Sequence, residues 1–190
     1  MMPNPVDFVK PTVRGRPSIF TVPAGVDPRD TANWTLVHQG QNVICAGMYQ
    51  AMTQLLMRNF DDWQATTIAL GFGGNYNEDG VDQGSRQPPA FTDTAMRKSF
   101  FEAPIVQVAP SIEDRFYYIA IIRPEDGNTD NEDLRPYIDE LGLLAANGTL
   151  LAHYITPADP LDATIATQYA KSTVEWLVIR WEIEFAGAPV

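Results

Sequence analysis

The feature that most limits the possible folds is a regular alternation of side-chain types near the C-terminus. Apolar side chains fall on one face of residues 173–185, namely Leu177, Ile179, Trp181, Ile183 and Phe185. Charged side chains alternate with them at Arg180, Glu182 and Glu184. Since successive side chains of a strand point to opposite faces, this pattern predicts a long antiparallel strand with one buried face.

Other segments also have the composition of strands. Short runs rich in β-branched and aromatic residues predict strands at residues 66–70, 100–108 and 115–122. Residues 141–155 predict a β-hairpin with Asn147-Gly148 as a two-residue turn. A short helix is expected over residues 161–170, before the C-terminal strand.

The principal helix is predicted over residues 42–58. Its apolar side chains recur at spacings of three and four and so share one face: Ile44, Met48, Met52, Leu55 and Leu56. Asn42 suits the N-cap position and Arg58 suits the C-terminal end. The methionines could supply an adaptable binding surface, but the pattern favours a place in the core.

The first 40 residues are interrupted by six prolines and cannot form a continuous helix. They predict an extended arm with short strands, followed by a single β-rich domain over residues 41–190. The arm either reaches over a neighbouring subunit or forms an edge strand with a tail. The expected fold class is β-rich α+β, with antiparallel sheets in a sandwich-like or helix-covered arrangement, one principal helix and the arm.

Charge and composition exclude several classes of protein. The chain has 190 residues with 24 acidic and 13 basic side chains, a net charge of −11, so nucleic-acid binding is not expected. No apolar run has the length of a membrane span, and the first residues lack the pattern of a signal peptide. We therefore expect a soluble protein with no membrane partner. Cys45 is the single cysteine, which excludes an internal disulfide and favours an intracellular site of assembly.

No motif in the sequence predicts an enzyme. Gly71-Phe72-Gly73-Gly74 lacks the Lys-Ser/Thr of a phosphate-binding loop, and its glycines instead predict a tight bend or a close backbone contact. His38 and His153 stand far apart, and Cys45 is expected to be buried and inert among apolar neighbours.

Paired acids such as Asp139-Glu140 are common in so acidic a chain and carry no catalytic signal. A calcium loop starting at Asn75 would need glutamate where Arg86 stands. No catalytic residue, cofactor or metal ligand is predicted, although a structural calcium ion remains open.

Several short motifs follow one another in a familiar order over residues 40–185. They are Asn42-Val43-Ile44, Ile68-Ala69-Leu70-Gly71-Phe72-Gly73, Thr92-Asp93-Thr94-Ala95-Met96-Arg97, Asp139-Glu140-Leu141-Gly142-Leu143, the Asn147-Gly148 hairpin and Trp181-Glu182-Ile183-Glu184-Phe185. This series resembles structural proteins of tailed bacteriophages, especially the N-terminal domains of tail-collar fibre and baseplate-proximal proteins. The resemblance implies that these motifs build a β-scaffold.

The resemblance further implies a non-enzymatic virion protein of the tail, baseplate or neck, made in the host cytoplasm and present in several symmetric copies. It would hold neighbouring virion proteins together. Because Val190 ends the chain just after the last predicted strand, an adaptor or collar component is expected rather than a complete fibre. Contacts with copies of the chain and with neighbouring virion proteins are expected through five residues of the arm: Val6, Phe8, Arg14, Arg16 and Phe20.

The alternative class is a carbohydrate-binding or capsid-decorating module. Its stacking platforms would be Trp34, Trp63, Trp176 and Trp181. The alternation around Trp181 instead predicts that this side chain belongs to the core.

Overall fold

The computed structural model describes residues 12–75, 83, 86–112, 114–128, 137–159, 162–166 and 169–186. In chain order the elements are β1 (Thr12–Pro23), the 3₁₀ turn η1 (Thr31–Asn33), β2 (Thr35–Gln39), β3 (Val43–Ile44), α1 (Ala46–Leu56), α2 (Phe60–Trp63), β4 (Ala65–Gly71), β5 (Ser99–Ile112), β6 (Arg115–Ile122), β7 (Tyr137–Ile138), β8 (Glu140–Ala145), β9 (Leu150–Ile155), β10 (Ala158–Asp159), β11 (Asp162–Ala166), β12 (Tyr169–Ala170) and β13 (Glu175–Ala186).

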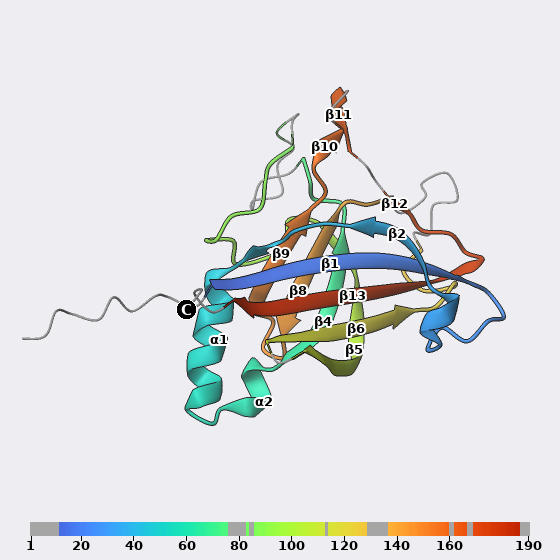
Figure 1. The fold of residues 1–190 in the computed structure, drawn as a ribbon. Coiled ribbons are helices and arrows are strands. Elements are labelled where there is room, and N and C mark those ends of the chain that lie inside the picture. The colour runs from blue at the N-terminus through green and yellow to red at the C-terminus, as the bar shows by residue number, and fades with distance from the viewer. Residues whose placement is uncertain are drawn as a thin grey trace, which may run out of the picture.

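Most of the strands belong to one curled antiparallel sheet in the order β2-β1-β13-β6-β5-β4-β8-β9-β3 (Figure 1). The curl brings the β3 edge back to β1. There the backbone N–H of Asn42, just before β3, donates a hydrogen bond to the backbone carbonyl of Gly15 at 3.2 Å. A side chain at position 15 would collide with that of Asn42, so glycine is needed at this contact. Since β-pairing is continuous from β2 to β3, the structure does not confirm a sandwich of separate sheets. The β-rich fold with one principal helix is confirmed.

The alternation predicted for the C-terminal strand is confirmed in β13. Leu177, Ile179, Trp181 and Ile183 are buried on the concave side of the sheet, together with Met48 and Ala51 of α1. On the other side, a smaller apolar cluster is built around Phe20, Val22, Ile119 and Val178. The curled sheet therefore buries apolar side chains on both of its faces.

The principal helix is shorter than predicted. It begins at Ala46 rather than at residue 42, because Val43 and Ile44 pair with β9 and Asn42 is hydrogen-bonded to β1. Cys45 is the N-cap residue, and the helix ends at Leu56 rather than at Arg58. Pairing with the sheet thus outweighs the capping preference of Asn42.

Two local predictions also require correction. The expected helix at 161–170 is replaced by β11 and β12, whose short pairings with β10 and β7 fix an extended backbone. The β8–β9 hairpin is confirmed, but its turn has three residues, since the amide of Ala145 donates to the carbonyl of Thr149. Gly148 closes that turn with a positive φ of 83°, which glycine adopts without strain.

The N-terminal arm is the largest difference between prediction and structure. Residues 12–23 form β1, an interior strand between β2 and β13, and β2 belongs to the same sheet. The prolines exclude a helix but are compatible with this extended strand, and Pro17 stands just before the first β1–β2 pair, at Ser18. Residues 1–11, including Val6 and Phe8, lie outside the described residues. Among the described residues, no helix combines the length and the apolar character needed to cross a membrane.

Candidate functional site

A buried polar cluster joins three segments that are distant in the sequence. They are the end of β4 with the following glycines, the segment that leads into β5, and the β8–β9 hairpin. His153 of β9 lies at the centre with a fully buried ring. Its Nδ1 is 2.6 Å from Oδ2 of Asp93, and its Nε2 is 2.9 Å from Oε1 of Glu140. We call Asp93, Glu140 and His153 the buried triad.

Both ring nitrogens of His153 face a carboxylate oxygen. His153 thus bridges the two carboxylates through both of its ring nitrogens. Arg97 adds a positive charge, with its guanidinium 3.7 Å from Oδ2 of Asp93. Hydrogen bonds together with a cationic partner are the condition for keeping carboxylates inside a protein.

Glu140 receives backbone hydrogen bonds as well. Its carboxylate accepts from the amides of Arg97 at 2.7 Å, Lys98 at 3.0 Å and Gly73 at 3.1 Å. Burial alone would raise the pKa of Glu140, but the hydrogen bonds from His153 and from the amides of Arg97 and Lys98 lower it below its ordinary value. A side chain at Gly73 would collide with the Glu140 carboxylate, which confirms the close backbone contact predicted for these glycines.

A second ion pair extends the cluster. The guanidinium of Arg86 lies 3.1 Å from Asp139 and donates to the carbonyl and hydroxyl oxygens of Thr156, each at 2.7 Å. Burial raises the pKa of Asp139, while Arg86 and the amide of Gly74 act in the opposite direction. Arg86 thereby ties the segment before β5 to the end of β9.

The geometry of the buried triad suits cross-linking better than catalysis. The side chains of His153 and Glu140 are inaccessible, and that of Asp93 is 4% exposed, so a substrate has no contact with them. Within the described residues, no group of three or more His, Cys, Asp or Glu side chains is arranged to hold a metal ion. Cys45 is buried as predicted.

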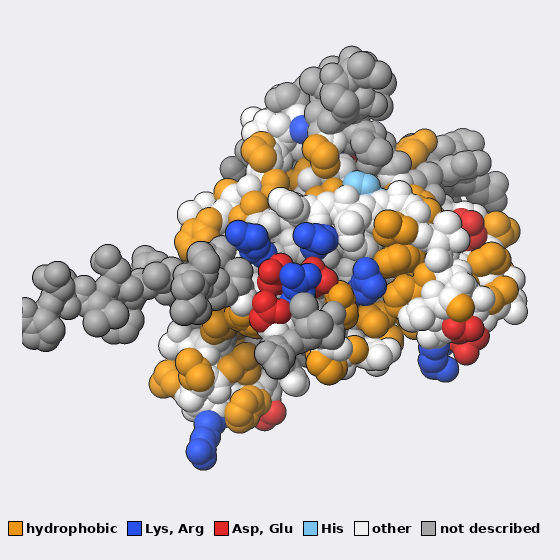
Figure 2. Space-filling view, in the orientation of Figure 1, with side chains coloured by type: hydrophobic (Ala, Val, Ile, Leu, Met, Phe, Trp, Pro, Cys, Tyr) orange, Lys and Arg blue, Asp and Glu red, His pale blue; other side chains and the backbone are white. Residues whose placement is uncertain are grey.

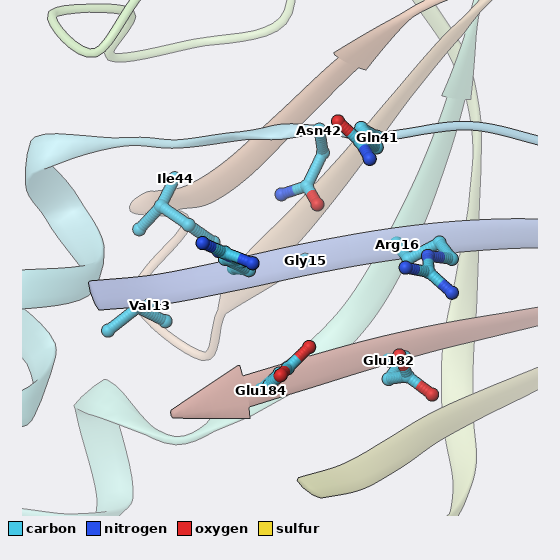
Figure 3. Close-up of a pocket in the computed structure, with 9 residues that line it drawn as sticks. Val13, Gly15, Arg16, Gln41, Asn42, Ile44, Glu182 and Glu184 are labelled. Atoms are coloured by element: carbon cyan, nitrogen blue, oxygen red, sulfur yellow. The ribbon is translucent and has the colours of Figure 1, made fainter. Parts of the chain in front are cut away.

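An accessible charged surface lies on the outer side of β1 and β13. Arg14 is opposite Glu184 and Arg16 is opposite Glu182 in the strand register. With Asn42 these side chains line a shallow cavity of about 250 Å³, which we call the charged groove (Figure 3). Figure 2 shows basic and acidic side chains side by side at the centre of this face.

The two arginines of the charged groove are accessible to a partner. Both are exposed, and neither forms an ion pair within the part of the chain that the structure describes. Glu184, in contrast, pairs with Arg115 at 3.3 Å.

The structure separates the residues predicted for interaction. It brings Arg14 and Arg16 together on the charged groove. Phe20 is buried, with its ring 5.1 Å from that of Trp34 and the Arg180 guanidinium 5.1 Å away. Val6 and Phe8 lie outside the described residues.

Sequence reasoning missed the buried triad, although one signal was present. Glu140 of β8 and His153 of β9 stand in two strands whose other members are mostly apolar. A charged residue within a buried strand requires a buried partner, but the sequence does not reveal Asp93, 60 residues away, as that partner.

Comparison of the chain with protein-family models, with curated proteins and with solved structures finds no match.

Proposed function

We propose that this chain is a non-enzymatic structural component of a tailed phage particle. Its place would be the tail, the baseplate or the neck and collar, where it would hold neighbouring virion proteins together after synthesis in the host cytoplasm. The observation that carries the proposal is the convergence of the motifs of the phage resemblance. Gly73, Asp93, Arg97 and Glu140, from three of these motifs, meet in one buried network.

Such a network is suited to a scaffold. Breaking a buried ion pair by removing one partner costs about 3–5 kcal/mol, so the segments that share the buried triad are held firmly together. The long connection between β4 and β5 is thereby fixed at both of its ends, at Gly73 and at Arg97. A virion protein that transmits force between neighbours benefits from a loop held in this way.

The proposed partners are other copies of the chain and neighbouring virion proteins, with symmetric copies in the particle. Arg14 and Arg16 in the charged groove are suited to acidic surfaces of such partners. Neither nucleic acid nor membrane is a proposed partner, since the net charge of −11 opposes binding to phosphate backbones.

The test is to delete the coding sequence from the phage that encodes it and to supply the chain from a plasmid as the control. We expect particles without a complete tail, neck or baseplate in electron micrographs, and restoration by the plasmid copy. A cryo-EM map of the complemented particle should contain the chain at one of these positions. Intact, infectious particles that lack the chain would refute the proposal.

The four tryptophans predicted as stacking platforms do not favour a carbohydrate-binding module. Such a module needs an accessible aromatic platform, but Trp181 is buried and the other three tryptophans are half-buried. The indole N–H of Trp34 is also used, since it donates to the carbonyl of Pro28 at 2.9 Å.

A further inference from the structure

Three large apolar side chains project from the turn between α1 and α2. Leu56 is 86% exposed, Met57 71% and Phe60 56%, and we call these three the apolar knob. Figure 2 shows hydrophobic side chains gathered over α1 and α2. Single exposed apolar residues are common, but a cluster of this kind marks an interaction surface.

The backbone holds the apolar knob in place. Arg58 lies at its centre with a φ of 66°, a left-handed conformation that is unfavourable for a residue other than glycine. The turn is nevertheless closed by two backbone hydrogen bonds, from Arg58 to Leu55 and from Asn59 to Gln54, each at 3.0 Å. The knob is therefore part of a defined turn.

The same chain carries an apolar pocket of about 410 Å³. Seven apolar residues line it, Pro28, Phe101, Ala103, Pro104, Val106, Ile121 and Trp176, among which Val106 is 56% exposed. Its lining also contains four charged residues, Asp27, Arg29, Arg123 and Asp126, which we call the rim. Apolar and charged side chains combined in this way are usual in a protein–protein contact.

The charges around the knob complement those around the pocket. Asp61 and Asp62 follow the knob in α2, and Arg29 and Arg123 stand on the rim of the pocket. Within the described residues, none of these four forms an ion pair. The rim also carries two acids, Asp27 and Asp126, to which Arg58 on the knob is complementary.

The two surfaces cannot meet within one molecule. Figure 1 shows α1 and α2 at one end of the sheet, whereas the end of β6 and the start of β13 lie at the other. Arg123 directly follows β6, and Trp176 is the second residue of β13. Knob and pocket are therefore both available to other molecules, one at each end.

We infer that the apolar knob of one copy binds the apolar pocket of the next, so that copies of this chain associate head to tail. Because the two surfaces differ, the contact is heterologous and leads to a closed ring or an open helical array. The inference goes beyond the proposed function, since it concerns a different surface from the charged groove and is argued without reference to a particle.

The experiment measures the mass of the purified full chain by light scattering, up to about 1 mM, the weak end of specific affinity. The knob variant is Leu56→Glu and the pocket variant is Val106→Glu. Leu36→Glu and Val174→Glu are matched controls, because these residues are 52% and 66% exposed but belong to neither surface. Thermal unfolding of each variant confirms that it is folded.

We expect the wild type and both controls to form assemblies larger than dimers as the concentration rises, and the knob and pocket variants to remain monomers. An equimolar mixture of Leu56→Glu and Val106→Glu should form a one-to-one dimer and nothing larger, because one intact knob and one intact pocket remain. If Val106→Glu fails to fold, Arg123→Glu replaces it, with self-association expected to weaken at least tenfold.

A wild type that stays monomeric overturns the inference, as does a knob variant that associates like the controls. Failure of the two monomeric variants to pair on mixing also overturns it, because it excludes a head-to-tail contact. These results are independent of the particle test, since the chain can be present in the virion without associating with itself.

Discussion

Glu140 is the residue on which the buried cluster depends most. It accepts hydrogen bonds from three backbone amides and from His153, and its side chain is inaccessible. We predict that Glu140→Ala lowers the free energy of unfolding by about 3–5 kcal/mol, because three buried backbone N–H donors and the ring of His153 lose their hydrogen-bond partner. Urea unfolding measures this change.

The matched control is Glu102→Ala on the exposed side of β5, which should change the free energy of unfolding by less than about 0.5 kcal/mol. Equal effects of the two substitutions would show that the buried cluster does not stabilise the fold.

The same cluster predicts a pH dependence of stability. In the folded chain the pKa of Glu140 lies below its ordinary value of 4.5. As the pH falls, the Glu140 carboxylate is therefore protonated in the unfolded chain before it is protonated in the folded chain. The stability that Glu140 contributes is therefore complete above about pH 4.5 and is lost as the pH falls through the folded pKa. The pKa of Asp139 is raised above 3.8, so protonation of this residue favours the folded chain as the pH falls.

We expect Glu140→Gln to reduce the loss of stability between about pH 5.5 and pH 3, and Asp139→Asn to increase it. The urea midpoint of each variant across this range gives the slope. An unchanged slope in Glu140→Gln would contradict the assignment.

At the residue scale, the sequence predicts burial better than it predicts partners. The alternation correctly placed Trp181 in the core, and the glycines after β4 correctly predicted a close contact. The pairing of His153 with Asp93 could not be predicted, because it depends on how the loop between β4 and β5 returns to β9. Local pattern carries no information on such contacts.

At the scale of elements, two neighbouring residues of α1 lie in different environments. Leu55 is half-buried beside Met52 and Trp63, whereas Leu56 is largely exposed. We predict that Leu55→Asp lowers the free energy of unfolding by about 2 kcal/mol or more, because it brings a charge into an apolar contact. Leu56→Asp should change it by less than about 0.5 kcal/mol. Thermal and urea unfolding compare the two, and equal losses would place Leu55 outside the packed face.

The helix boundaries show why elements were only partly predictable. Helical periodicity correctly placed Met48 in the core, but it was wrong for Leu56, which was expected on the same face and is 86% exposed. It could not locate the start, because Val43 and Ile44 fit a strand as well as a helix and the choice is made by pairing with β9. The short strands after β9 were missed for the same reason, since they exist only through their partners.

At the scale of the whole molecule, the pairing of β1 shows whether residues 12–23 are part of the fold or an arm attached to it. It pairs with β13 without interruption from Thr12 opposite Ala186 to Pro23 opposite Glu175. The proline pattern predicted an extended conformation, and the structure contains one. What the sequence could not show is the surface on which that extended segment lies.

The last prediction concerns removal of this strand. Four buried apolar side chains leave with β1, namely Val13, Ile19, Phe20 and Val22. Each contributes roughly 1.5–3 kcal/mol when buried, and their sum is comparable with the net stability of a domain, about 5–15 kcal/mol. We therefore expect a chain that lacks residues 1–23 to have no cooperative thermal transition by circular dichroism. A chain that lacks only residues 1–11 keeps every pairing described for β1 and should unfold cooperatively. Cooperative unfolding of the longer deletion would show that β1 is dispensable and that residues 12–23 are an attachment after all.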